Sequence, residues 1–316
     1  MRTKALAMAL LFLFALATGA LAQEYGVFVK ARQGLSGPFD RAVSETADAL
    51  KKAGWEVLAS YENGVPEDCG FRAHTLVVYS EDYARSLLAH GPRAAFALPL
   101  RVSVYEDETG INVAFLNPAS LNRTVLGDGV ESGLSRSVME ELATALAVLE
   151  GHESSVQIGQ LRTEGHVGGM GGGDFADKVQ TIYEGGALED ALRGVNESIE
   201  KNTLGWKKVY EVDAGEVAIV GIAKSATEAK AFGIAGEKRR NDTFRCPGLD
   251  HAAAFPIEVV LYTHEGTARV EILDEMYRMK VYFEDAGRWA FMKNMTMPGH
   301  IEDEVVEVST SALRKK

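Results

Sequence analysis

Apolar and polar residues alternate along residues 98–122 in a pattern that predicts a β-hairpin. The apolar positions before the turn are Leu98, Leu100, Val102 and Val104. Residues 106–110 supply a polar turn that ends in glycine, and Ile111, Val113 and Phe115 then resume the alternation. Because two strands alone are marginally stable in water, the apolar face of this hairpin needs a cover.

The same pattern recurs 157 positions later, in residues 255–279. The identical pairs under this offset are Pro99/Pro256, Val102/Val259, Tyr105/Tyr262, Glu108/Glu265, Val113/Val270 and Leu116/Leu273. Similarity of a chain to itself at a fixed offset indicates a repeated structural unit. The sequence therefore predicts two copies of one unit.

The remaining periodicities predict one order of elements for both halves. In the first half we expect strands at 25–31, 55–61 and 75–79, helices at 39–53, 81–90 and 134–149, and the hairpin. In the second half we expect strands at 179–183, 208–212 and 216–222, helices at 188–199 and 226–233, and the second hairpin. This order predicts an α+β fold in which each antiparallel sheet is covered by helices on one face. The other sheet face, or the groove between the halves, is then left open.

The two copies differ in length. Gly54-Trp55 and Gly205-Trp206 end the first helix of each half at an offset of 151, whereas the hairpins are offset by 157. The increase predicts six extra residues in the second copy, placed in the polar segment 236–248.

The N-terminus predicts an export signal over residues 1–22. Arg2 and Lys4 precede an uncharged apolar run at 5–18, and Ala20-Leu21-Ala22 is typical of a signal peptidase site. The run is shorter than the roughly 20 residues that span a bilayer, which disfavours the alternative of an uncut anchor. We therefore expect cleavage after Ala22 and a periplasmic or secreted protein.

Glycine content divides the remaining chain. Residues 165–173 contain six glycines, which is typical of a flexible connector. A phosphate-binding loop is the alternative, but the lysine and hydroxyl residue that end a P-loop are missing. The expected organisation is a first domain at 23–150, a glycine-rich linker at 151–175 and a second domain at 176–316.

Charge is spread evenly. The formal charge of −12 becomes −14 once Arg2 and Lys4 are removed, and each half then carries −7. Without a basic region, nucleic acid is a poor candidate partner, and so is an anionic membrane after signal cleavage. A small molecule or a periplasmic protein is the expected partner.

Residues 97–102 (Ala-Leu-Pro-Leu-Arg-Val), 104–107 (Val-Tyr-Glu-Asp) and 115–118 (Phe-Leu-Asn-Pro) together resemble the domain-of-unknown-function family 302. The resemblance covers about 60 residues of the first half, and the second half looks like a diverged copy in which Asp274-Glu275 replaces Asn117-Pro118. It implies two tandem TATA-binding-protein-like units with the order β-α-β4-α, and it implies no established activity.

Methionines near the C-terminus form a candidate metal site. Met292, Met295, Met297 and His300 have the spacing of soft thioether and imidazole ligands, which suit Cu(I) outside the cytoplasm. The alternative is core packing, since methionine fills irregular gaps.

The two cysteines, Cys69 and Cys246, lie in different halves. An interdomain disulfide and two separate thiols both fit an oxidising compartment. Cys246 and His251 are also candidates for a catalytic thiol pair, with Asp250 expected to point elsewhere because it is adjacent to the histidine in sequence. The alternative is a turn with a buried cysteine.

These observations favour an exported protein that binds a small ligand or a partner protein without catalysis, at a sheet face or in the interdomain cleft. The alternatives are periplasmic metal handling through the methionine-rich tail, with copper as the candidate cofactor, and a thiol-based redox enzyme at Cys246.

Overall fold

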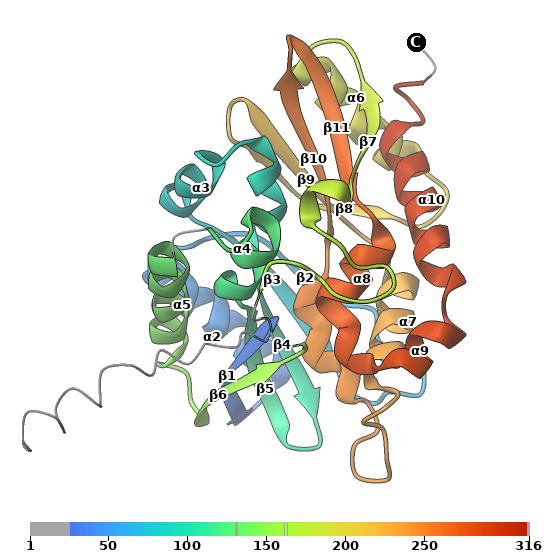
Figure 1. Ribbon diagram of the computed structural model, residues 1–316. Helices are drawn as coiled ribbons and strands as arrows, with labels where there is room; N and C mark the ends of the chain where they lie inside the picture. Colours follow the sequence, from blue (N-terminus) through green and yellow to red (C-terminus); the bar gives the residue numbers. More distant parts are fainter. Residues whose placement is uncertain (1–25, 130–131, 161, 163, 315–316) are drawn as a thin grey trace, which may run out of the picture.

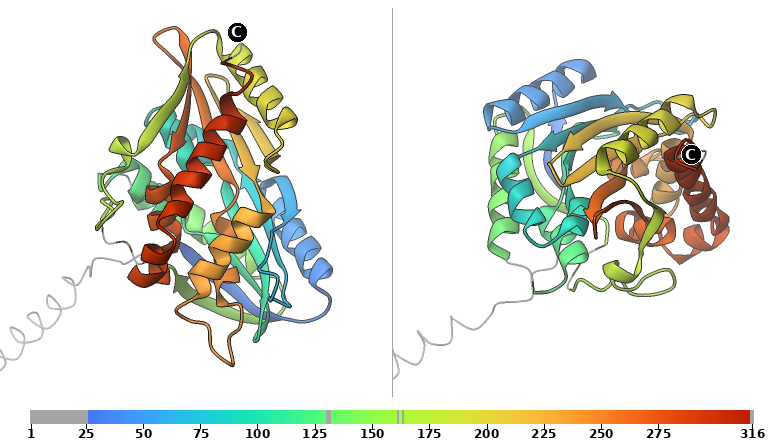
Figure 2. Two further views of the ribbon diagram at one scale, coloured as in Figure 1. Left: turned by 90° about the vertical axis from the view of Figure 1, so that its right-hand side faces the viewer. Right: turned by 90° about the horizontal axis from the view of Figure 1, so that it is seen from above.

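Two antiparallel sheets lie side by side, and helices cover their outer faces (Figures 1 and 2). The computed structural model describes residues 26–129, 132–160, 162 and 164–314. The expected signal peptide at 1–22 lies outside these residues. Within the described part of the chain, none of the helices has the length and apolar character needed to cross a bilayer. The α+β fold class is confirmed.

The first half forms a six-stranded sheet in the order β2-β3-β4-β5-β1-β6. Its strands are β1 (Phe28–Leu35), β2 (Glu56–Glu62), β3 (Ala73–Tyr79), β4 (Leu100–Asp107), β5 (Gly110–Leu116) and β6 (His152–Ile158). Its helices are α2 (Phe39–Lys52), α3 (Glu81–Leu88), the 3₁₀ helix η1 (Pro92–Ala97), α4 (Pro118–Leu126) and α5 (Ser132–Leu146). The apolar stripe of α2 is buried against the sheet, as its helical spacing predicts.

The second half forms a five-stranded sheet in the order β7-β11-β10-β9-β8. Its strands are β7 (Val179–Glu184), β8 (Lys207–Asp213), β9 (Val217–Ala223), β10 (Ile257–His264) and β11 (Thr267–Leu273). Its helices are η2 (Phe175–Asp177), α6 (Leu188–Lys201), α7 (Ser225–Gly236), η3 (Pro247–Ala254), α8 (Glu275–Phe283), η4 (Glu284–Ala286), α9 (Arg288–Lys293) and α10 (Thr296–Thr310). Helices α6 and α10 pack together on the outer side (Figure 2).

The two halves share strand order and register. Read from β2 and from β8, both sheets follow one order, and β6 is an addition to the first. The β2–β3 pair shifts register between Val57 and Ala59, and the β8–β9 pair shifts between Lys208 and Tyr210, which are the positions 151 further on. Both predicted hairpins are confirmed as β4–β5 and β10–β11. Pro99 and Pro256 occupy equivalent places, each between a 3₁₀ helix and the first hairpin strand.

The prediction that the length difference lies in residues 236–248 accounts for only part of it. The loop between β2 and β3 spans residues 63–72, whereas the loop between β8 and β9 spans only 214–216. The offset therefore falls to 144 at β3 and β9 before it rises to 157 at the hairpins. The second copy regains length because α7 has 12 residues against 8 in α3, and because residues 237–246 replace the short connection 89–91.

The predicted open sheet faces are covered. Helix η3 of the second half packs on β3, β4 and β5 of the first sheet, while η1 of the first half packs on β9 and β10 of the second. Reciprocal contacts of this kind are those of a two-fold symmetric pair. The core is consequently continuous across both halves.

One ion pair lies at the centre of this arrangement. Arg101 on β4 pairs with Glu258 on β10, and these positions are equivalent at the offset of 157. Residues on a two-fold axis face their own copies, so equal charges here would repel each other. Arg101 is 1% exposed and Glu258 5% exposed. Because the two copies differ at this position, the buried pair consists of two opposite charges.

Sequence periodicity missed several elements. Residues 152–158, which were expected in the linker, form β6 and pair with β1. Most of β6 is exposed because it is an edge strand, so it lacks a buried alternating face. Helices α4 and α8 to α10 were not expected; α4 and α8 are buried on several sides, which removes the one-sided stripe that periodicity detects.

Cys69 and Cys246 form a disulfide, which decides between the two alternatives left open by the sequence. The cysteines lie in 63–72 and 237–246, the two loops in which the copies differ most. Arg240 and Asp68 add an ion pair of 3.1 Å between the same loops. The unequal loops thus join the two halves at one end of the molecule.

Candidate functional site

A pocket of about 300 Å³ lies between the two halves, where the edge strand of one sheet meets the edge strand of the other. Strand β2 supplies one wall, and β8 together with the start of α7 supplies the opposite wall. The lining residues are Ala59, Ser60, Tyr61, Glu62, Gly205, Lys207, Lys208, Val209, Ala223, Ser225 and Glu228. We call this space the β2–β8 pocket.

A buried carboxylate forms the polar floor of the β2–β8 pocket. Glu228 on α7 is 1% exposed, and its Oε1 accepts hydrogen bonds from Tyr61 Oη at 3.0 Å and Asn63 Nδ2 at 3.1 Å. Its Oε2 accepts a bond of 2.7 Å from the backbone N–H of Gly64. All three donors belong to the first half and the acceptor to the second. The floor therefore exists only when the two halves are assembled.

The backbone at Gly64 comes very close to α7. A Cβ atom at this position would lie 2.0 Å from the carbonyl oxygen of Ser225, so only glycine fits. This close approach brings the N–H of Gly64 within reach of Glu228. Burial raises the pKa of Glu228, and the hydrogen bonds from Gly64, Asn63 and Tyr61 partly offset that rise.

The internal repeat provides a natural comparison for this site. A second pocket of about 480 Å³ is formed by the equivalent elements, the end of β3 and α3 against the end of β8. Its lining residues are Tyr79, Glu81, Ala84, Arg85, Leu88, Ala89, Asp213 and Ala214. We call it the α3 pocket. The registers of the strands make Ala84, Val212 and Ala214 the counterparts of Glu228, Tyr61 and Asn63.

The backbone around the two pockets is therefore equivalent, but the side chains differ. The residues equivalent to Glu228, Tyr61 and Asn63 are alanine, valine and alanine, and of these Ala84 and Ala214 line the α3 pocket. The backbone positions are equivalent because Asn63 N–H bonds to Ala73 O and Ala214 N–H bonds to Val217 O. The fold can thus be built with small apolar residues at these positions, and the polar floor is specific to one pocket.

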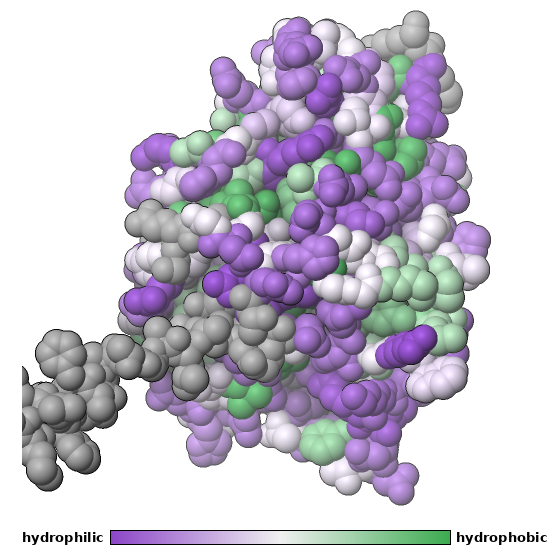
Figure 3. Space-filling model, in the orientation of Figure 1, coloured by the Kyte–Doolittle hydropathy of each residue, from purple (hydrophilic) through white to green (hydrophobic). Residues whose placement is uncertain are grey.

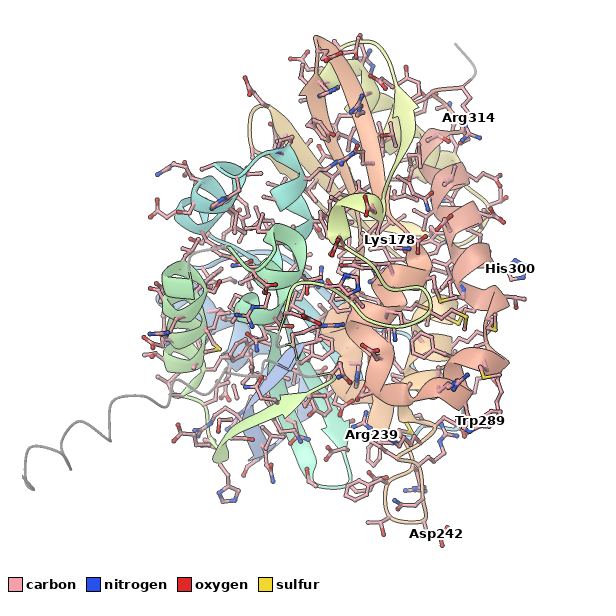
Figure 4. The ribbon with its side chains drawn as sticks, in the orientation of Figure 1. Lys178, Arg239, Asp242, Trp289, His300 and Arg314 are labelled. Atoms are coloured by element: carbon pink, nitrogen blue, oxygen red, sulfur yellow. A yellow bond between two sulfur atoms is a disulfide. The ribbon has the colours of Figure 1, made fainter. Side chains whose placement is uncertain are left out.

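The structure does not gather the predicted methionine ligands on one surface. Met292 and Met295 are exposed, whereas Met297 lies in the first turn of α10 and is buried. His300 projects from the outer side of α10 (Figure 4). Within the described residues, no three His, Cys, Asp or Glu side chains are grouped as metal ligands. The burial of Met297 supports the packing alternative for that residue.

The predicted thiol pair is also arranged differently. Cys246 is bonded to Cys69, and His251 makes its hydrogen bonds to carboxylates. His251 Nδ1 lies 2.6 Å from Asp250 Oδ1, and its Nε2 lies 3.0 Å from Asp285 Oδ1. The expectation that Asp250 points away is wrong, because the side chains of Asp250 and His251 are both buried and lie within hydrogen-bond distance of each other.

These groups form a buried charge network. Arg239 donates two hydrogen bonds to Asp250, and His251 stacks on Phe283 at 5.6 Å between ring centroids. Burial alone lowers the pKa of His251, but Asp250 and Asp285 outweigh burial and raise that pKa from its usual 6.5 to about 9. His251 is therefore an imidazolium at neutral pH and links η3 to Asp285 on η4.

This network predicts how stability depends on pH. The pKa of His251 is raised in the folded state, so its contribution is complete below pH 6.5 and is lost as pH rises through 9. The shift corresponds to about 3 kcal/mol. We expect urea denaturation to show that loss between pH 6 and pH 9, and we expect His251→Gln to abolish it.

His300→Gln is the matched control for this experiment, because it makes the same substitution at an exposed histidine and keeps the His251 network intact. Parallel profiles for the native chain and His251→Gln would show that the imidazolium does not stabilise the fold.

Sequence reasoning missed Glu228, Tyr61 and Asn63. Aligning the two copies would reveal these residues, because Glu228 is equivalent to Ala84 and Tyr61 is equivalent to Val212. That comparison requires the offset of 144 at α3 and α7, which the structure reveals. With offsets of 151 and 157 only, Glu228 has no meaningful counterpart.

The fold and the pocket define a protein built of two pseudo-equivalent α+β units with a polar site between them. Residues 32–149 match the family model described as "Domain of unknown function DUF302". The matched region lies within the first half, so the likeness of the second half rests on strand order and register. The comparison with curated proteins gave no match.

The solved structures that are similar to part of this chain include one bacterial protein. It is described as an uncharacterized conserved protein DUF302 from Bacillus stearothermophilus, and it shares 18% sequence identity with a TM-score of 0.35. The similar region covers 39% of this chain and 98% of that chain. No conclusion about function follows from this likeness.

Proposed function

We propose that this protein is exported and binds a small polar molecule in the β2–β8 pocket without converting it chemically. The observation that carries the proposal is the polar floor of this pocket and its absence from the α3 pocket. Burying a carboxylate is unfavourable unless hydrogen bonds compensate it. The equivalent backbone is formed with alanine at position 84, so the fold itself does not require Glu228.

The floor is arranged for recognition. Both oxygens of Glu228 accept hydrogen bonds from fixed donors, which holds the carboxylate in one orientation. Tyr61 Oη donates to Glu228 and accepts from Asn63 Nδ2 at 3.2 Å, so the phenol is fixed as well. Apolar side chains of Ala59, Val209 and Ala223 also line the pocket, and fixed polar groups beside apolar side chains are typical of sites that orient a small ligand. The ligand class that fits carries a hydrogen-bond donor toward this floor.

A thermal-shift screen tests the proposal. The panel comprises amino acids, polyamines, nucleosides, sugars and small carboxylic acids, added to the purified chain. A ligand present at about 100 times its Kd contributes about 2.7 kcal/mol to stability. For a chain of this size, that corresponds to a rise in Tm of roughly 5 °C.

Two matched variants locate the binding site. Ala59→Phe fills the β2–β8 pocket, and Ala89→Phe makes the same substitution in the α3 pocket. We expect a ligand that stabilises the native chain to stabilise Ala89→Phe equally and to lose its effect on Ala59→Phe. A ligand that still shifts the Tm of Ala59→Phe, or a panel without any ligand, would contradict the proposal.

A further inference from the structure

An exposed apolar patch lies where α9 meets the start of α10. Its members are Trp289, Met292 and Met295, which are 75%, 42% and 49% exposed. Trp289 and Met292 are three residues apart and so share one face of α9, while Ala290 on the opposite face is buried. We call this the α9 patch. Figure 3 shows a pale green area over this region, and Figure 4 places Trp289 at the edge of the molecule.

Basic side chains surround the α9 patch. Arg288 and Lys293 lie on α9 itself and are exposed. Lys238 lies beside them, because a Cβ atom on Gly287 would come within 3.5 Å of its side chain. The acidic neighbours are Glu237, which pairs with Lys293, and Glu284 and Asp285 on η4, which pair with Lys280 and His251. No ion pair of Arg288 or Lys238 occurs within the described residues, so both charges are available to a partner.

The local charge thus differs from that of the chain as a whole. The protein carries −12, and counting charge over each half predicts no attraction to an anionic membrane. That count hides a small region in which the local acidic side chains are paired and the basic side chains of Lys238 and Arg288 form no ion pair among the described residues. The fold creates this region by placing the start of the 237–246 loop beside α9.

The composition of the α9 patch fits a lipid surface better than a protein surface. Tryptophan is enriched at the interface between a bilayer and water, where its ring has both apolar and polar surroundings. Lysine is depleted at interfaces between proteins. Short apolar surfaces flanked by Lys and Arg bind anionic bilayers, and each nearby basic residue contributes about 1 kcal/mol.

We propose that the α9 patch docks on the surface of an anionic lipid bilayer, with Trp289 in the headgroup region and the basic side chains facing lipid phosphates. The contact is peripheral. This inference is independent of the β2–β8 pocket and of its ligand.

Tryptophan fluorescence tests this docking directly. The chain has three tryptophans, and Trp55 and Trp206 are only 3% and 2% exposed. A change on adding vesicles therefore reports on Trp289. We expect vesicles containing phosphatidylglycerol to shift the emission to shorter wavelength and to protect it from acrylamide quenching. Vesicles of phosphatidylcholine alone should do neither.

Charge variants and sedimentation complete the experiment. Lys238→Gln combined with Arg288→Gln should weaken co-sedimentation with phosphatidylglycerol vesicles roughly 30-fold, since two basic charges are lost. Arg85→Gln combined with Arg193→Gln is the matched control on other exposed helices and should bind as the native chain does. Unchanged quenching with both vesicles, or equal binding to neutral vesicles, would overturn the proposal. Shielding of Trp289 at high protein concentration without lipid would mean that a second copy covers the patch, which would also overturn it.

Discussion

Replacing Arg101 by methionine should lower the free energy of unfolding by about 3–5 kcal/mol, the usual effect of removing one partner from a buried ion pair. The variant leaves Glu258 buried without its counter-charge. It also removes the hydrogen bonds that Arg101 donates to Ala253 O at 2.7 Å and to Tyr282 Oη at 2.8 Å. Urea denaturation with circular dichroism measures the change.

A second variant separates the charge from the packing. Arg101→Met combined with Glu258→Met removes both charges, and replacing a buried ion pair by apolar residues is often neutral. We expect it to recover most of the stability lost in the single variant. Arg85→Met, on the exposed face of α3, should leave the midpoint of denaturation nearly unchanged. A single variant as mild as this control would show that the pair on the pseudo-two-fold axis does not hold the halves together.

Removing the disulfide should have a comparable effect. Cys69 and Cys246 are separated by 177 positions, and closing so long a loop restricts the unfolded chain strongly. The chain-entropy model gives up to about 5 kcal/mol for this loop length. We expect Cys69→Ser combined with Cys246→Ser to lower the free energy of unfolding by that order and to remain folded, because the core is continuous across both halves.

A reductant provides the internal control for the disulfide. Dithiothreitol should lower the denaturation midpoint of the native chain to that of the double serine variant, and it should not change the variant itself. A native chain whose midpoint is unaffected by full reduction would show that the cross-link does not contribute to stability.

The strands and helices show which features of the fold can be predicted from the local sequence. Period-two alternation in β4–β5 and β10–β11 predicts both hairpins, because a strand with one buried face has apolar residues at every second position. The edge strand β6 and the buried helix α8 lack such a periodic pattern. Strand β6 is exposed along most of its length, and α8 is covered on several sides.

The site residues could not be predicted from the sequence for a related reason. Glu228 reads as a solvent-exposed residue in the first turn of a helix, where acidic side chains are common. Its burial depends on Tyr61, Asn63 and Gly64, which lie more than 160 positions away. Helical periodicity describes how a residue faces its own element, and it contains nothing about a loop from the other half that covers the helix end.

The amino-acid sequence by itself determined the α+β class, the repeated hairpin, and the strands and long helices that present one apolar face. These features follow from interactions between residues close together in the chain. Only the tertiary structure decided that η1 and η3 cover the opposite sheets, that Cys69 meets Cys246, and that Glu228 has donors. The reason is that such contacts join segments far apart in sequence, and their geometry is fixed only when both halves pack against each other.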